Sequence, residues 1–313
     1  MQELNKYLLS MAYSRSDKAI LSTLVYADIF KFPLSQEELW DFLIINRKIE
    51  RVLFEQDLKK LCKQAIIYHE SGFYCLKGQE KNIAKRKANL LEVKRKLLLA
   101  KKAAYYLSYI PTVYFIGISG GLAIGNVEKK DDIDLFIIAK KKTLFITRLW
   151  ILALLELLHM RRKRYAGKDS ASDKICVNLL VDETSLGWPK NKQDIYIAHE
   201  IMQLKPLFER KGMYRKFLSA NQWTKSFLLH SKPHLVLYKW SNNYQTVKCI
   251  SIILALPPLE LLVRAFQKKL IRRHQTNESV SNKALAFHPR DYRKETLGLL
   301  QRDLKRLGVL TNI

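Results

Sequence analysis

Cysteine is scarce in this chain of 313 residues. The four cysteines, Cys62, Cys75, Cys176 and Cys249, stand far apart and form no CxxC pair. Zinc sites and disulfide frameworks need closely or regularly spaced cysteines. The sequence therefore indicates neither kind of site, and we expect a cytoplasmic protein kept under reducing conditions.

Long, clean apolar runs are also missing. The two most apolar segments, residues 144–160 and 247–263, contain charged side chains, and the second also contains Pro257 and Pro258. Both fall short of the roughly 20 clean apolar residues that a membrane-spanning helix needs. We therefore expect buried helices and no transmembrane span. The basic residues after position 263 leave a peripheral membrane contact through the second segment as an alternative.

Acidic residues are few relative to basic ones. Lys and Arg number 55 against 29 Asp and Glu, which gives a net charge of +26 and a pI near 9.8. A field of this sign attracts polyanions such as nucleic acid, nucleotide phosphates or anionic membranes. A generally lysine-rich proteome accounts for the same charge equally well, so the charge alone identifies no ligand.

Residues 1–80 are predicted to form a first domain. Three amphipathic segments are followed by a segment that alternates around Ser71-Gly72, as a hairpin does. Ser35, three residues before Glu38, predicts a capping box at the start of the second helix. This order resembles a winged helix-turn-helix domain, which implies a nucleic-acid contact through the third helix and its lysines. Docking of another protein is the alternative use of such a domain.

The rest of the chain is predicted to continue as an α+β protein. Residues 81–110 form a basic connecting helix, residues 111–205 alternate between strand and helix, and residues 206–313 are mostly helical. The expected architecture is therefore an N-terminal winged helix-turn-helix, a small mixed-sheet core and a helical C-terminal region. The basic face of the connecting helix is interpreted either as a solvated surface or as a contact for an anionic ligand.

The stretch that carries chemistry is GISGGLAIGNVEKKDDIDLFI, residues 117–137. Asp132 and Asp134 are two residues apart on a predicted strand, so both side chains project from the same face. Ile133 and Leu135 then point to the other face, into a core. Two neighbouring carboxylates repel each other unless a cation offsets them. Hard oxygen ligands at this spacing suit Mg²⁺, which can also hold nucleotide phosphates.

Three glycines precede the aspartates. Gly120 and Gly125 have the separation of a P-loop, but Asn126 and Val127 replace the Lys and Ser/Thr that should follow. The GxGxxG order of a dinucleotide fold is absent too. What the stretch offers is a tight turn at Gly120-Gly121, whose backbone N–H groups can face an anion.

Gly120-Gly121, ten further residues and then Asp-x-Asp on a strand resemble the nucleotidyltransferase superfamily, which has the polymerase β-like fold. The wider pattern, with a winged-helix-like N-terminus and the segments AHEIMQLKPL and FHPRD, looks like a poorly characterised bacterial subgroup. The resemblance implies Mg²⁺-dependent transfer of NMP from NTP to an unknown hydroxyl acceptor, with pyrophosphate release. It also implies two Mg²⁺ ions held by Asp132 and Asp134, and a phosphate-holding turn that includes Gly125.

Active members of that superfamily often carry a third carboxylate on the neighbouring strand. Here the predicted neighbour is KICVNLLVDE, in which Asn178 is central and Asp182 lies four residues later. The resemblance therefore implies Asp132, Asp134 and Asp182 as catalytic residues. Ser119 and Asn178 are added to the glycines as nucleotide-binding residues. Two alternatives stay open: a two-carboxylate enzyme, or a non-catalytic regulator that senses nucleotide or binds nucleic acid through a degenerate transferase fold.

The dipeptide His199-Glu200 is a further candidate for chemistry. It lies on a predicted helix, yet Gln203 stands where an HExxH zinc motif needs its second histidine. We therefore expect structural roles for both residues.

Overall fold

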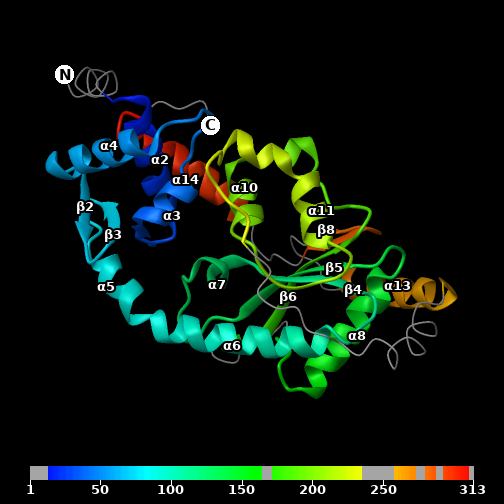
Figure 1. The fold of residues 1–313 in the computed structure, drawn as a ribbon. Helices are drawn as coiled ribbons and strands as arrows, with labels where there is room; N and C mark the ends of the chain where they lie inside the picture. The colour runs from blue at the N-terminus through cyan, green and yellow to red at the C-terminus, as the bar shows by residue number, and fades with distance from the viewer. Residues whose placement is uncertain (1–12, 164–170, 235–256, 273–278, 287–291, 310–313) are drawn as a thin grey trace.

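The computed structural model describes residues 13–163, 171–234, 257–272, 279–286 and 292–309. These residues form a mixed α+β protein with two separate sheets, one of three strands and one of six (Figure 1). The α+β class predicted from the sequence is therefore confirmed. None of the described helices combines the length and apolar character that crossing a bilayer requires. Part of the predicted membrane-contact segment and the whole FHPRD sequence lie outside the described residues.

The N-terminal part builds three helices and a small antiparallel sheet in the predicted order. Its elements are α2 (Arg15–Ile29), β1 (Leu34–Ser35), α3 (Gln36–Asp41), α4 (Arg51–Lys63), β2 (Ile67–Glu70) and β3 (Phe73–Leu76). At the start of α3, the Ser35 hydroxyl accepts from the Glu38 N–H at 3.2 Å, and the Glu38 carboxylate accepts from the Ser35 N–H at 2.8 Å. The predicted capping box is thus confirmed.

The predicted connecting helix consists of two helices in the structure, α5 (Lys81–Ala88) and α6 (Leu90–Leu107). One of its lysines does not belong to a solvated face, because Lys96 is completely buried. Its ammonium donates to the carbonyl oxygens of Lys129 at 3.1 Å and Asp131 at 2.6 Å, and to the Asp173 carboxylate at 2.7 Å. These acceptors compensate for the burial of the charge. Lys96 therefore anchors α6 to two distant loops, one of which leads into the aspartate motif.

The larger sheet is mixed, and its central strands carry the predicted motif. In spatial order the strands are β7 (Lys205–Glu209), β4 (Val113–Ile118), β5 (Ile133–Ala139), β6 (Ile175–Asp182), β9 (Ala284–Ala286) and β8 (Ser279–Val280). β5 and β6 run parallel, and every other neighbouring pair is antiparallel. The motif therefore sits on the parallel pair at the centre of the sheet.

The C-terminal region, predicted to be mostly helical, also contributes β7, β8 and β9 to this sheet, and these strands were not predicted. β8 and β9 have two and three residues, too few for a recognisable alternation of apolar and polar side chains. The segment that forms β7 continues a helical pattern in the sequence, but Pro206 cannot extend a helix. Proline is tolerated in β7 because this strand lies at the edge of the sheet.

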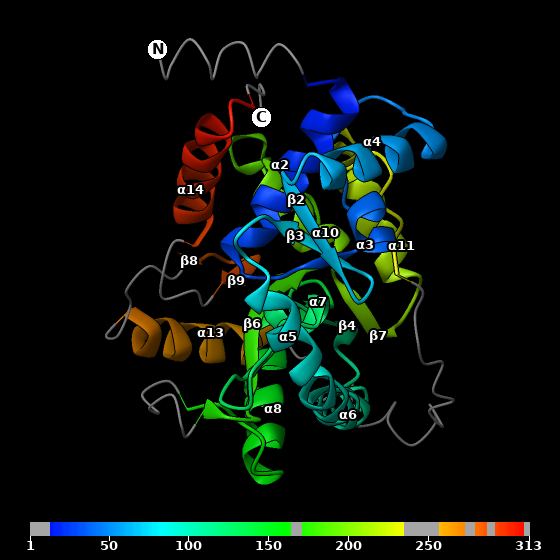
Figure 2. The same ribbon diagram turned by 90° about the vertical axis from the view of Figure 1, so that its left-hand side faces the viewer.

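Helices cover both faces of the larger sheet (Figures 1 and 2). α6 and α8 (Leu144–Leu157) pack on one face, and α10 (Ile195–Met202) and α11 (Met213–Ala220) pack on the other. Along β5, Phe136 joins the cluster on the α10 face, whereas Leu135 joins the cluster on the α6 face. The remaining elements are α7 (Gly120–Ile124), η1 (Lys190–Lys192), η2 (Gln222–Ser226), α13 (Pro257–Arg272) and α14 (Tyr292–Arg306).

The hydrophobic cluster on the α10 face continues into the N-terminal part, across the predicted domain boundary at residue 80. It contains buried apolar side chains of α2, α3 and α4 together with those of α10, α11 and α14. Tyr26 stacks on His199 with ring centroids 3.9 Å apart, and the Ile45 N–H donates to the Phe227 carbonyl at 2.8 Å. The N-terminal part is therefore packed as a portion of the same core.

Candidate functional site

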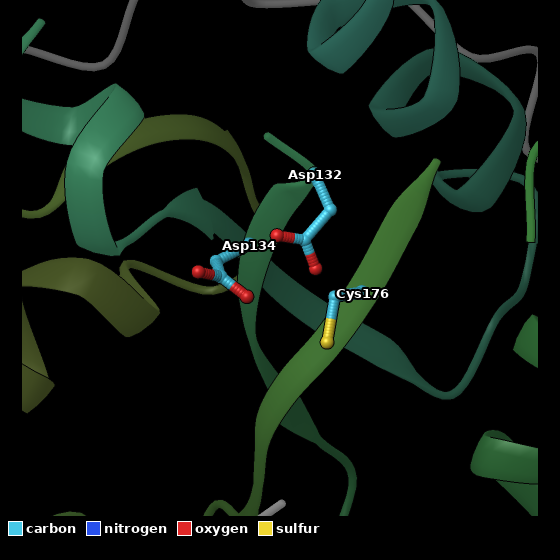
Figure 3. A group of neighbouring side chains, drawn as sticks. All are labelled: Asp132, Asp134 and Cys176. Atoms are coloured by element: carbon cyan, nitrogen blue, oxygen red, sulfur yellow. The ribbon is translucent and has the colours of Figure 1, made fainter. Parts of the chain in front are cut away.

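The aspartate pair lies at the start of β5, next to the loop that the buried lysine of α6 anchors. Asp132 immediately precedes the strand, and Asp134 is its second residue. Ile133 and Leu135 are fully buried, as the predicted alternation requires. Figure 3 shows both carboxylates near Cys176 of β6. One potential ligand atom from each of these three residues lies within 4.8 Å of the others.

The parallel pairing of β5 with β6 determines which side chain faces the aspartates. Asp134 pairs directly with Cys176, and Leu135 pairs with Val177. The next residue of β5 pairs with Leu179, so Asn178 has no partner on β5. Asn178 is thus the extra residue of a β-bulge, and a bulge shifts the alternation of the side chains beyond it. Cys176, rather than a residue with an oxygen ligand, is therefore the β6 neighbour of the pair.

Asp182 is not brought to the aspartate pair, which corrects its sequence-based assignment. It pairs with Ala139, five positions along β5 from Asp134, and this separation corresponds to about 17 Å. Its carboxylate accepts from the Lys142 N–H at 2.9 Å, and from the Thr184 N–H and hydroxyl at 2.8 and 2.6 Å. The alternation of side chains along β6 does not predict the position of Asp182, because the bulge at Asn178 reverses it. Asp182 stabilises the turns at the far end of the sheet.

The glycine turn packs directly on Asp134. The Ser119 N–H donates to the Asp134 carbonyl at 3.0 Å. Gly120 has a φ of +62°, and a Cβ at this position would lie 2.9 Å from Asp134 Oδ2. A Cβ at Gly121 would lie 2.6 Å from a backbone carbonyl oxygen. Glycine at position 120 therefore allows the turn to approach the carboxylate, and glycine at position 121 allows the turn itself to close. Gly125 ends α7 with a φ of +81°.

Arg162 supplies a positive charge beside the pair. Its guanidinium lies 2.6 Å from Asp132 Oδ2 and donates to the Cys176 sulfur at 3.6 Å. The contact with Asp132 is a charge contact rather than a directed hydrogen bond, because that buried oxygen has no partner of hydrogen-bonding geometry. One guanidinium thus faces two carboxylates.

The positive charge beside the aspartate pair is smaller than the negative charge of two ionised carboxylates. Burial, and then the negative charge of Asp132, raise the pKa of Asp134 from 3.8 to about 7. Burial and the two carboxylates also raise the pKa of the Cys176 thiol well above its usual value. A further cation at this position would stabilise the ionised carboxylates.

A cavity of about 390 Å³ opens beside the pair, between the larger sheet and the N-terminal part. Gly120, Gly121 and Asp134 line it from the sheet, and residues of α2 and α3 line it from the N-terminal part. The Asn126 side-chain amide donates to the Phe30 carbonyl at 2.9 Å. This bond ties the glycine turn to the N-terminal wall of the cavity.

Ser119 and Asn178 line a smaller neighbouring cavity of about 60 Å³. The Ser119 hydroxyl is buried without a hydrogen-bond partner. Asn178 is only 6% exposed and lines both cavities. Buried polar groups are normally hydrogen-bonded, so both side chains lie where a polar ligand or water can satisfy them.

Glu200, for which the sequence predicted only a structural role, is a further candidate. It lies on α10 and lines both cavities, and burial raises its pKa from 4.5 to about 7. No hydrogen bond or ion pair joins it to another residue in the described part of the chain. A usable signal was present in the sequence, because α10 carries a polar stripe at helical spacing on an otherwise apolar helix. The stripe consists of Tyr196, His199, Glu200 and Gln203.

The donor atoms at the pair fit a hard divalent cation in part. The two carboxylates are suitable ligands for Mg²⁺. The third member of the group is the Cys176 thiol, a soft ligand that suits other metals better. Among the described residues, the group contains no third carboxylate. The ligand set therefore fits one hard cation held by Asp132 and Asp134, with its remaining ligands supplied from outside the protein.

The structure gathers most of the predicted site residues around the two cavities. The residues that line one of the cavities are Ser119, Gly120, Gly121, Asp134 and Asn178. Asp132 lies next to Asp134. Gly125 shapes the turn without lining either cavity, and Asp182 lies elsewhere. Comparison of the chain with family models, with curated protein sequences and with solved structures gives no match.

Proposed function

We propose that the protein is a metal-dependent nucleotidyltransferase, which moves an NMP group from an NTP to a hydroxyl acceptor. The observation that carries this proposal is the contact between the glycine turn and Asp134, with Asp132 beside it and a cavity in front of it. Backbone N–H groups that suit phosphate oxygens thereby lie next to carboxylates that suit a cation. The proposal includes a polymerase β-like core and a winged-helix-like N-terminal part.

In the proposed reaction, the acceptor oxygen bonds to the α-phosphorus of the NTP. The bond between that phosphorus and the bridging oxygen breaks, and pyrophosphate leaves. The acceptor hydroxyl passes its proton to the Glu200 carboxylate. A pKa near 7 suits this side chain to act as a general base at neutral pH.

The other residues bind and orient the nucleotide. Gly120 and Gly121 hold the distal phosphates through backbone N–H groups. Ser119, whose buried hydroxyl has no hydrogen-bond partner, and Asn178 contact the nucleotide from the smaller cavity. When bound by the two aspartates, one divalent cation would offset phosphate charge and favour ionisation of the acceptor hydroxyl.

The test is transfer of label from NTPs that are labelled at the α-phosphate, in the presence of Mg²⁺, to the protein and to a panel of small hydroxyl compounds. The double variant Asp132→Asn/Asp134→Asn should lose at least about 10³-fold in rate, because it removes both charged metal ligands. Glu70→Gln, an exposed change on β2, is the matched control and should behave as wild type. If the double variant transferred label and bound Mg²⁺-nucleotide like wild type, the site assignment would be wrong.

The presence of Cys176 and Asn178, where a third carboxylate is expected, favours a second candidate function. In this case the protein binds nucleotide or nucleic acid and transfers nothing. The third helix gives limited support to a nucleic-acid contact, since Lys60 is already paired with Asp17 at 2.6 Å and Asp57 at 2.9 Å. Salt-dependent DNA or RNA binding that survives loss of both aspartates, without any label transfer, would support this function.

A further inference from the structure

The larger cavity has the opposite charge character from the chain as a whole. The chain carries a net charge of +26. The acidic and basic side chains that line the cavity, apart from its histidines, are Glu38, Asp41, Asp134, Glu200 and Lys205. Carboxylates thus dominate a cavity inside a strongly basic protein, and a low-dielectric enclosure strengthens their attraction for a cation.

Most of this negative charge has no internal partner. Glu38 is compensated, because Arg86 pairs with it at 2.7 Å. Asp41 forms no ion pair in the described ranges, although the nearby charges of Lys232 and Arg51 act on it; Glu200 has neither an ion pair there nor a nearby cation. The one ammonium among the lining side chains is that of Lys205, and burial lowers its pKa. The cavity therefore keeps an excess of uncompensated carboxylate.

The histidines of the cavity do not reverse this balance. Burial lowers the pKa of His199 to about 4, and its Nδ1 lies 2.9 Å from the Ile195 carbonyl oxygen. Burial, and then the charge of Lys205, lower the pKa of His234 as well. Both imidazoles are consequently neutral near pH 7 and add no positive charge.

The walls of the cavity are aromatic. Tyr26, Phe30, Phe32 and Phe42 line it from the N-terminal part, and Tyr196 lines it from α10. Aromatic faces attract cations and pack well against flat apolar groups. The volume of about 390 Å³ is that of a pocket for a small molecule.

We propose that this cavity binds a small organic cation, with its ammonium compensated by Glu200 and Asp41 and its flat apolar part against the aromatic wall. That such a cation also carries the acceptor hydroxyl rests on the proposed nucleotidyl transfer. The binding itself does not, and it requires neither NTP nor metal.

The experiment measures binding by calorimetry to the full chain in EDTA, at about pH 8 so that the carboxylates are ionised. Three probes of similar shape differ in charge: tyramine is a cation, 4-ethylphenol is neutral, and 4-hydroxyphenylacetate is an anion. Tyramine should bind at least about tenfold more tightly than 4-ethylphenol, and the anion should bind least. Glu200→Gln should weaken tyramine binding about tenfold and leave 4-ethylphenol unchanged. Glu70→Gln should change neither.

Asp41→Asn provides a second variant in case Glu200→Gln does not fold, which circular dichroism would reveal. Equal affinity for the three probes, no tyramine binding at millimolar concentration, or no effect of either variant would overturn the proposal. If tyramine binds as expected but no label transfer is found, only the proposed transferase activity fails.

Discussion

The two ends of the β5–β6 pair both carry aspartates of low exposure, but the partners of these aspartates differ. At one end, Asp182 is 4% exposed and accepts hydrogen bonds from two backbone N–H groups and a hydroxyl. At the other end, Asp132 and Asp134 share one guanidinium and lie beside a thiol. The difference shows that an aspartate near a motif belongs to the fold when its oxygens are satisfied, and is available to a ligand when they are not.

Removal of Asp182 should have the largest effect on stability. Asp182→Ala leaves two N–H groups without their acceptor, so the free energy of unfolding should fall by about 3 kcal/mol. Mg²⁺ affinity at the other end of the strands should stay within about twofold of wild type. Glu183→Ala is the control, because half-buried Glu183 accepts only one bond, from the Lys141 N–H, and its loss should cost below about 1 kcal/mol. Chemical denaturation measures both variants; a loss of Mg²⁺ binding in Asp182→Ala would break the comparison.

Crowding of the aspartate end should weaken metal binding without a matching loss of stability. In Gly120→Ala the added Cβ meets Asp134 Oδ2, so Mg²⁺ affinity should fall roughly thirtyfold. Gly78→Ala is the matched control, because Gly78 also has a positive φ but nothing within 4 Å of its added Cβ. Both variants should lose about 1 kcal/mol of stability from backbone strain. Equal Mg²⁺ affinity in the two variants, measured by calorimetry, would contradict the role of the turn.

A third carboxylate at position 176 should strengthen Mg²⁺ binding at the aspartate end. Cys176→Asp puts a hard oxygen ligand opposite Asp134, and Mg²⁺ affinity should rise about tenfold. Cys176→Ser, which removes the thiol but adds no charge, should change the affinity by less than about threefold. Titration with Mg²⁺ distinguishes the two variants. If serine and aspartate had the same effect, the metal would lie away from Cys176.

The smallest predicted effect concerns pH. The raised pKa of Asp134 means that the folded chain holds a proton more tightly than the unfolded chain. Its contribution to stability is therefore complete below about pH 4 and is lost as the pH rises through about 7. Metal-free wild type should lose about 1 kcal/mol between about pH 6 and 7 relative to Asp134→Asn. Denaturation of both proteins across this range provides the check, and parallel curves would show that Asp134 is not desolvated.

Local patterns in the sequence predicted the elements that local chemistry determines. The capping box at Ser35, the hairpin around Ser71-Gly72 and the alternation from Asp132 along β5 all depend on near neighbours. Each is present in the structure. The glycine turn and the aspartate pair also lie within one short segment, so their contact was predictable from the chain alone.

What the sequence could not predict depends on pairing between distant segments. The bulge at Asn178 arises only when β6 pairs with β5, and it removes Asp182 from the face that alternation predicts. Lys96 is part of a basic helix pattern in the sequence, but in the structure its buried ammonium donates to Asp173, far along the chain. Glu200 lines a cavity only because the N-terminal part packs against α10. Tertiary contacts decide each of these cases.

The shared hydrophobic cluster that joins α2, α3 and α4 to α10, α11 and α14 has a consequence for cooperativity. Helices that bury their apolar faces against one another cannot separate without exposing both, so these segments form one unfolding unit. A fragment without the first helices would keep both aspartates and the glycine turn. It would lose one wall of the cavity and leave the His199 face of α10 open to water. Enclosure of the cavity is thus a property of the cooperatively folded whole.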